Sequence, residues 1–219
     1  MKIYIQIFLK SIIFISFLFF TSCDQKKESE KKVTTENFES DQKELSLDSI
    51  KRISVGEENA KITIIAYESL TCGHCADFHK NVYPDLKKDF IEKGLVKIEF
   101  RHFPLDILAF NASKIGQCNN DGNEDVLNIL YSGQKKWAKG KTPEEATKYL
   151  KKFLEDENVN LDFEECLNDK SIEDYVLNDR IEGSKKFEVN ATPTIIINNK
   201  KFEKALNYEN LKKYLEKLV

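Results

Sequence analysis

The sequence predicts an α/β domain in which two parts of one β-sheet are separated by a block of helices. Three observations carry this prediction. A strand–helix–strand pattern fills residues 50–104, a strand–turn–strand–helix pattern fills residues 188–219, and residues 105–187 show helical periodicity without a strand pattern. Two strands joined by a helix within one sheet are expected to run parallel, with a right-handed crossover.

In residues 50–104, runs of β-branched residues predict the strands, and one glycine predicts the end of the helix between them. Apolar runs bounded by polar or turn residues predict its strands. The expected strands are residues 50–55, 62–67 and 96–100. Between the last two, residues 73–92 have the spacing of a helix, in which Pro84 is expected to cause a kink and Gly94 to mark the end.

The middle block consists of successive helical runs. Its clearest helix start is at Thr142, a capping residue followed by Pro143 and two acidic residues. The expected helices are residues 107–118, 124–138, 143–154, 162–167 and 171–187. The block is therefore expected to be a helical insertion between the two parts of the sheet.

The last part of the chain returns to β-structure before a final helix. Residues 194–197 predict a strand, and Asn198 and Asn199 predict a turn after it. A short partner strand at residues 201–202 and an amphipathic helix at residues 208–218 follow.

Two cysteines separated by two residues stand between the strand at 62–67 and the helix after it, in the tetrapeptide Cys72-Gly73-His74-Cys75. Thiols at this spacing suit reversible disulfide chemistry. The first turn of a helix has unpaired N–H groups and the positive end of the helix dipole. A thiolate at Cys72 would be stabilised there, so we expect a redox-active pair.

Other uses of this motif fit less well. A c-type haem site needs His directly after the second cysteine, where this chain has Ala76. A zinc site needs about four ligands, and only Cys72, Cys75 and His79 are available nearby. A purely structural disulfide remains open, although so small a loop gains little chain-entropy stabilisation. We therefore predict no metal at this site.

A proline directly before the strand at 194–197 is the second informative feature. Pro193 lacks the N–H group that a strand ladder needs. A cis Thr192–Pro193 bond in a tight turn would explain it and would expose the backbone of Thr192 to an extended peptide. An ordinary trans proline at the start of a strand is the alternative.

The N-terminus has the pattern of a secretory signal over residues 1–22. Lys2 and Lys10 precede or flank an apolar stretch at residues 12–20, and small residues lead to Cys23. A transmembrane anchor is the alternative, but the stretch is shorter than the ~20 residues that a bilayer needs. The segment before Cys23 also resembles a bacterial lipobox, with Phe20 as its weakest match, so we expect export to the periplasm, with lipid attachment at Cys23 as a further expectation.

The remaining cysteines and the composition are consistent with an exported globular domain. Residues 23–49 are polar and charged, and they predict a flexible tether or a frayed terminus without a role. Once Cys23 is lipidated or removed, an even number of cysteines is left in an oxidising compartment. Cys118 and Cys166 can then pair or remain buried thiols. The net charge of −3 gives no sign of a nucleic-acid partner.

Together these motifs resemble the DsbA-like family of thioredoxin-fold thiol–disulfide oxidoreductases. The resemblance begins near residue 50 and rests on Cys-Gly-His-Cys after a strand, the helical insertion, and Val-Asn-Ala-Thr-Pro-Thr at residues 189–194 before a strand. It implies a thioredoxin fold with a helical insertion between its β-α-β and β-β-α halves.

The resemblance also implies roles for individual residues. Cys72 would be the nucleophile and Cys75 the resolving thiol, while Thr192 and Pro193 would contact the substrate peptide. The segments around Cys118 and Cys166 look like those of members with an extra disulfide in the helical block, so the resemblance implies a structural disulfide between these two cysteines. His74 would help to stabilise the thiolate, as fits an oxidase, unless it is an idle surface residue; His79 and His102 are assigned no role.

One position departs from the family pattern. Many members have a buried acid six residues before the nucleophile, and this chain has Ala66 there. Glu68 lies on the same face of the strand, because side chains two residues apart point the same way. Glu68 could replace the missing acid or be solvated at the end of the strand, and we favour the second interpretation.

We therefore expect an exported protein-disulfide oxidoreductase that introduces disulfides into secreted or periplasmic proteins. We expect it to need no cofactor and to be a monomer rather than an oligomer, and the resemblance implies a membrane redox partner that reoxidises it. A disulfide isomerase or reductase of the same fold is one alternative. A membrane-side copper chaperone that uses Cys72, Cys75 and a nearby histidine is another.

Overall fold

The structure, a computed structural model, describes residues 50–118 and 121–219. The predicted signal segment at residues 1–22, the predicted tether at 23–49 and Cys23 lie outside these residues, so their assignments stay predictions. Within the described residues, no helix combines the length and apolar character needed to cross a bilayer.

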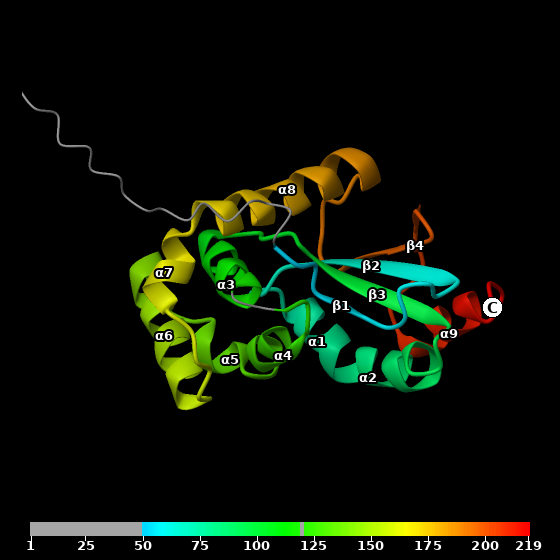
Figure 1. Cartoon of the computed structure of the whole chain (residues 1–219), viewed down its shortest axis with the longest axis horizontal. Coiled ribbons are helices and arrows are strands. Elements are labelled where there is room, and N and C mark those ends of the chain that lie inside the picture. Colours follow the sequence, from blue (N-terminus) through cyan, green and yellow to red (C-terminus); the bar gives the residue numbers. More distant parts are fainter. Residues whose placement is uncertain (1–49, 119–120) are drawn as a thin grey trace, which may run out of the picture. The chain divides into compact units, whose positions relative to one another are not determined.

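The described residues form a five-stranded mixed sheet in the order β1-β3-β2-β4-β5 (Figure 1). The central strand β2 (Ile62–Glu68) pairs in parallel with β3 (Val96–His102) and antiparallel with β4 (Thr194–Ile197). β1 (Ser54–Val55) and β5 (Lys200–Lys201) add antiparallel edges to β3 and β4. The β2–β4 pairing joins the two parts of the sheet that the sequence predicts.

The strand boundaries differ from the predicted ones at the ends. β1 is limited to two residues of the predicted stretch, and β3 extends to His102, whose backbone N–H donates to the Asp179 carboxylate over 3.0 Å. The partner strand predicted at residues 201–202 is β5, one residue earlier. For β3, this hydrogen bond joins the strand end to α8, a contact that the pattern of the strand alone does not contain.

The helix predicted at residues 73–92 is broken rather than kinked. It consists of α1 (Gly73–Asn81), α2 (Tyr83–Leu86) and a π-helical turn, η2 (Lys87–Ile91). Pro84 is the second residue of α2 and has no N–H to donate to the preceding turn. Val82, between α1 and α2, has a φ of −122°, outside the helical range. The proline therefore separates two helices.

The insertion between β3 and β4 is helical, as predicted. Its helices are α3 (Ile107–Gln117), α4 (Asp125–Ser132), α5 (Gln134–Trp137), α6 (Pro143–Asp156), α7 (Phe163–Asn168) and α8 (Lys170–Phe187). The run predicted at residues 124–138 is divided at Gly133 into α4 and α5. A Cβ atom on Gly133 would collide with the ring of Phe153 on α6, so glycine allows these helices to approach closely.

The C-terminal part ends in a hairpin and a helix. Asn198 and Asn199 both have positive φ values, 47° and 64°, in the turn between β4 and β5. The helix α9 (Tyr208–Leu215) is capped by the side chain of Asn207 and ends before the predicted residue 218.

The two faces of the sheet are covered by different helices. Along β2, Ile64 and Ala66 face the main core, which includes α1, α2 and α9. Ile65 and Tyr67 face a smaller cluster beside α8, where the Tyr67 ring lies 6.0 Å from that of Phe187. Figure 1 shows α8 on one side of the sheet and α1 and α2 on the other. The strand's alternation therefore places residue 68 on the α1 side.

Candidate active site

The first cysteine of the tetrapeptide lies at the N-terminus of α1. Cys72 has extended backbone angles, and its carbonyl accepts the N–H groups of Cys75 and Ala76 over 3.2 Å each. Its sulfur is half-buried and donates to the carbonyl oxygen of Thr192 over 3.3 Å. The fold thus brings together the two motifs that stand 120 residues apart in the sequence.

The surroundings of Cys72 favour its thiolate. Its pKa falls from the usual thiol value of 9.0 to about 5, chiefly through a hydrogen bond from the Cys75 thiol, against the opposing effect of burial. The Thr192 side chain and the backbone N–H groups of Cys75 and His74 lower the pKa further. The contribution of His74 comes through its backbone, while its side chain is exposed.

Cys75 has the opposite character. Its side chain is fully buried, and burial is the main cause that raises its thiol pKa well above the ordinary value. The hydrogen bond with Cys72 and the carboxylate charge of Glu68 raise this pKa further. At neutral pH, Cys72 is therefore a half-buried thiolate and Cys75 a buried thiol.

The Thr192–Pro193 bond is cis, the conformation that the sequence left open beside trans. Thr192 is half-buried, with its carbonyl toward Cys72. Pro193 lines a groove of about 450 Å³ next to the start of α1. The other residues that line it are His74, Asp77, Phe78, Asn81, Val82, Leu206, Asn207 and Tyr208.

Gln134, on α5, holds the loop that carries Cys72. Its side-chain amide is buried and donates to the backbone oxygens of Leu70 over 2.8 Å and of Cys72 over 3.0 Å. Sequence analysis missed it. The signal was its helical spacing, because Gln134 lies four residues after Leu130 and three before Trp137, both fully buried.

Glu68 is buried, so the interpretation of a solvated carboxylate at the strand end is wrong. Its side chain is 4% exposed, and its Oε2 lies 2.8 Å from Nε2 of His79 on α1. His79, which was assigned no role, is stacked on the Tyr131 ring of α4, with ring centroids 4.1 Å apart. The strand end is covered because α1 and α4 cross it, an arrangement that strand alternation alone does not contain. His102 is also buried, and its Nε2 lies 3.0 Å from Oε1 of Gln117.

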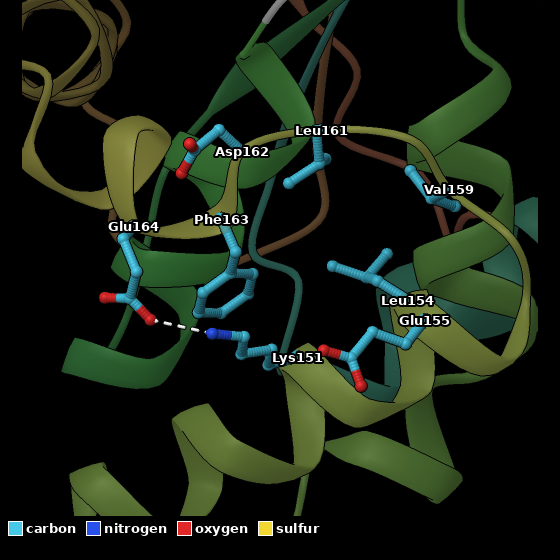
Figure 2. A pocket seen from close by; sticks show the side chains of 8 residues that line it. All are labelled: Lys151, Leu154, Glu155, Val159, Leu161, Asp162, Phe163 and Glu164. Atoms are coloured by element: carbon cyan, nitrogen blue, oxygen red, sulfur yellow. Dashed lines mark hydrogen bonds and ion pairs between the residues drawn. The ribbon is translucent and has the colours of Figure 1, made fainter.

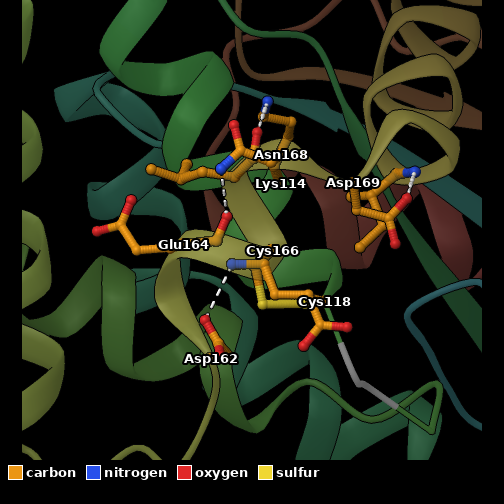
Figure 3. Close-up of a disulfide and its surroundings, with 10 residues drawn as sticks. Lys114, Cys118, Asp162, Glu164, Cys166, Asn168 and Asp169 are labelled. Atoms are coloured by element: carbon orange, nitrogen blue, oxygen red, sulfur yellow. Dashed lines mark hydrogen bonds between the residues drawn. A yellow bond between two sulfur atoms is a disulfide. The ribbon is translucent and has the colours of Figure 1, made fainter. Parts of the chain in front are cut away.

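Cys118 and Cys166 are joined by a disulfide in the structure, with Cα atoms 5.6 Å apart (Figure 3). Both cysteines are buried. The bond links the residue that follows α3 to α7, and the N–H of Cys166 donates to the carbonyl of Asp162 within the same turn. It therefore crosslinks the insertion internally, 48 residues apart in sequence.

A second hollow of about 260 Å³ lies between α6 and α7, where Lys151 pairs with Glu164 over 3.0 Å (Figure 2). None of the residues that line it belongs to either motif. Among residues 50–118 and 121–219, no three His, Cys, Asp or Glu side chains are grouped as a metal site.

The fold and the site together define a class of protein. A mixed sheet assembled from β-α-β and β-β-α halves, two cysteines at a helix N-terminus and a neighbouring cis-proline loop are the features of thioredoxin-fold thiol–disulfide oxidoreductases. Residues 48–217 match the family described as thioredoxin, and the chain belongs to this family as a DsbA-like member with a helical insertion.

Solved structures agree with this assignment. Alpha-DsbA1 of Wolbachia pipientis superimposes with a TM-score of 0.68 and 29% identity, covering 79% of this chain and 95% of that one. BdbD of Bacillus subtilis shares the fold, with a TM-score of 0.59, 23% identity, and coverage of 76% of this chain and 92% of that one.

Two kinds of curated relative are similar in sequence. Disulfide bond formation protein D of Bacillus subtilis is 26% identical over 176 residues, which are 74% of this chain and 75% of that protein. A Rickettsia bellii protein named as a candidate protein-disulfide oxidoreductase is 31% identical over 86 residues, 38% of this chain. The match spans only 33% of the Rickettsia protein's length.

Proposed function

We propose that the protein is an exported protein-disulfide oxidoreductase that introduces disulfides into other exported proteins. The observation that carries this proposal is the contrast within one pair: Cys72 has a thiol pKa of about 5, whereas burial raises that of Cys75 far above the usual value. A stabilised Cys72 thiolate favours the reduced form of the pair. The oxidised pair is therefore a strong acceptor of electrons.

The reaction proceeds in two exchanges. A substrate thiolate attacks Sγ of Cys72 in the oxidised pair, forming a mixed disulfide and releasing the Cys75 sulfur, which takes up a proton. A second substrate thiolate attacks the substrate's own sulfur in that mixed disulfide and expels Cys72 as a thiolate. Two electrons pass from the substrate thiols to the pair, and a leaving thiol of low pKa leaves faster.

The cis-proline loop supports a role in holding the substrate. The carbonyl of Thr192 is directed at Cys72, and Pro193 lies in the adjoining groove. We infer that Thr192 and Pro193 contact an extended substrate segment while His74 lines the same groove. Backbone hydrogen bonds would supply the free energy of this contact, so binding would depend little on the sequence of the substrate.

Relatives support the cellular setting. The name of the Bacillus subtilis relative describes disulfide bond formation, and the DsbA and BdbD homologues are extracytoplasmic. We propose that this protein acts in the periplasm after export, with lipid attachment at Cys23, and that a membrane redox partner reoxidises Cys72 and Cys75. The Cys118–Cys166 bond would serve a structural role there.

The reduction potential of the Cys72–Cys75 pair, measured against glutathione, tests the proposed direction. We expect a value of about −120 to −180 mV, the range of oxidising and isomerising enzymes. A value near about −270 mV, as in thioredoxin, would assign a reductase instead. Tight, stoichiometric copper binding that is lost in Cys72→Ser would favour the chaperone alternative.

A further inference from the structure

The segment between β3 and α3 lies along the turn that leads into the tetrapeptide. The backbone N–H of Phe103 donates to the carbonyl of Glu68 over 2.7 Å. That of Leu105 donates to Oγ of Ser69, a fully buried side chain, over 3.3 Å. The N–H of Cys72 closes the turn by donating to the carbonyl of Ser69 over 3.0 Å. This segment therefore contacts the turn that ends at Cys72.

Asp106, at the end of this segment, has a side chain that serves two elements. Its Oδ1 accepts the N–H of Ala109 over 2.7 Å and so caps α3. Its Oδ2 accepts a hydrogen bond from the hydroxyl of Thr71 over 2.6 Å, across 35 positions of sequence. A helix cap needs only the first of these oxygens. The second joins the start of the helical insertion to the residue directly before Cys72.

The bond between Thr71 and Asp106 contributes little to the stability of the fold. Asp106 is exposed and Thr71 is half-buried, so water can replace either partner. Hydrogen bonds that exchange with water in this way give only a small net free energy. The consequence of this bond lies instead in its place, one residue before the sulfur that exchanges.

The insertion contacts the same turn at a second element. Gln134, on α5, donates to the backbone carbonyls of Leu70 and Cys72. Asp106, at the start of α3, accepts from the side chain of Thr71. Backbone and side chain of one turn are thus held by two helices that are not part of the sheet. Both contacts restrict the rotation of the chain just before α1.

The charge on Cys72 depends on where its sulfur lies. Its pKa is lowered chiefly by the Cys75 thiol, and then by Thr192 and the backbone N–H groups of Cys75 and His74. The sulfur also lies 3.3 Å from the carbonyl oxygen of Thr192. Hydrogen bonds weaken steeply as their angles depart from linearity. A small rotation of the turn would therefore weaken several of these contacts at once.

We propose that the hydrogen bond from Thr71 to Asp106 is a positioning contact for thiol–disulfide exchange. It fixes the turn before α1, so that Sγ of Cys72 stays beside the first N–H groups of the helix and the loop of Thr192 and Pro193. Thr71 and Asp106 act through the backbone of Cys72 and are not catalytic residues. This role presupposes the proposed exchange at Cys72.

The test is a thiolate titration of Cys72 by absorbance at 240 nm, in the reduced full-length chain with Cys23→Ser. Thr71→Val keeps the shape of the side chain, removes the hydroxyl and leaves the cap of α3 in place. Thr71→Ser keeps the hydroxyl. Thr147→Val is the matched control, because the Thr147 hydroxyl donates to the carbonyl of Pro143 within α6. Circular dichroism at each pH shows whether a variant is folded.

We expect Thr71→Val to raise the midpoint of the titration by about 0.5 pH units or more, because the sulfur is held less closely to the groups that stabilise its charge. Thr71→Ser and Thr147→Val should both titrate as the unsubstituted chain does. A bond that served stability alone would leave the midpoint of every folded variant unchanged. Recovery in Thr71→Ser would assign the effect to the hydroxyl.

Two neutral variants of Asp106 separate position from charge. Asp106→Asn keeps an oxygen for the N–H of Ala109 and has an N–H group that the Thr71 oxygen can accept. Asp106→Ser keeps one capping oxygen for α3 and has no second polar atom for Thr71. Both remove the same negative charge. Asp106→Ser should therefore titrate about 0.5 pH units or more above Asp106→Asn.

Equal midpoints in folded Thr71→Val and the unsubstituted chain would overturn this role, and so would equal midpoints in the two Asp106 variants. If Thr71→Val does not fold, the two Asp106 variants decide. Failure of the proposed exchange would look different. The unsubstituted chain would then show no thiolate below about pH 8, whereas failure of the positioning role leaves the low midpoint in place in every folded variant.

Discussion

The two cysteine pairs of this molecule differ in their spacing along the chain, in their burial and in the groups around their sulfur atoms. Cys72 and Cys75 are three positions apart at the start of α1, one half-buried beside a groove and the other fully buried. Cys118 and Cys166 are 48 residues apart and both buried between helices of the insertion. Around the first pair, hydrogen bonds stabilise the charged form of the Cys72 sulfur, and the carboxylate of Glu68 acts on Cys75.

The difference shows what makes a cysteine pair redox-active. A helix N-terminus, a partner thiol and Thr192 stabilise one charged sulfur, while the other is kept as a thiol by burial. Both cysteines of the insertion pair are buried and joined to each other. Exposure of one sulfur to a substrate, combined with unequal pKa values, separates an exchange site from a crosslink.

Removing the crosslink should reduce stability without reducing exchange. The double variant Cys118→Ser/Cys166→Ser loses the disulfide that closes this loop. Its free energy of unfolding, measured by denaturant titration, should fall by about 2–4 kcal/mol. Exchange with a model dithiol peptide should stay near the unsubstituted rate. Cys72→Ser should do the reverse, with exchange falling to the uncatalysed rate. A loss of exchange in the double variant would break the comparison.

Removing the hydrogen bonds from Gln134 to the loop that carries Cys72 should lower the stability of the protein. Gln134→Met leaves the buried carbonyls of Leu70 and Cys72 without this donor and should lower the free energy of unfolding by about 1–3 kcal/mol. It should also raise the pKa of Cys72, because the helix start is less firmly held. Lys135→Met, at an exposed neighbouring position, is the control and should change neither quantity.

The reduced protein should gain stability with rising pH in a window that the oxidised protein lacks. The folded pKa of Cys72 is about 5, below the 9.0 of an ordinary thiol. The unfolded chain therefore binds more protons between these values, and the stabilisation is complete above the higher one and lost as pH falls through the lower one. Denaturation of reduced protein against Cys72→Ser from pH 4 to 9 measures this. Parallel curves would contradict the assigned pKa.

The smallest effect is expected at Thr192. Thr192→Val removes the hydroxyl that helps to lower the pKa of Cys72 and keeps the side-chain volume. The pKa should rise by less than it does when Cys75 is replaced, because Cys75 is the larger cause. Thiolate absorbance at 240 nm reports both values. A larger rise in Thr192→Val than in Cys75→Ala would reverse this order.

Much of the fold could be predicted because local patterns coincide with the elements. The β-branched run at residues 62–67 became the central strand, and the cap at Thr142 became the start of α6. The break before Pro84 was predicted only as a kink, because a proline in the sequence indicates where a helix is disturbed but not how the chain continues. The predicted helix at residues 124–138 is divided at Gly133, which packs against Phe153 of α6, a contact between helices that the local pattern does not contain.

The site could be predicted only where residues adjacent in sequence make it. The tetrapeptide and the Thr192–Pro193 step were visible as motifs, and the fold brings them into contact. The environment of Glu68 was not visible, because helices from two other parts of the chain bury it. Gln134 was missed for the same reason, since its two acceptors are backbone atoms more than 60 positions earlier.

The most direct test of the unequal pair is a thiolate titration of the reduced protein by absorbance at 240 nm, in the Cys23→Ser background. We predict one titration with a midpoint near pH 5, which Cys72→Ser abolishes, and no second thiolate up to pH 9. Two titrations below pH 9, or none below pH 8, would contradict the account of a stabilised Cys72 and a buried Cys75.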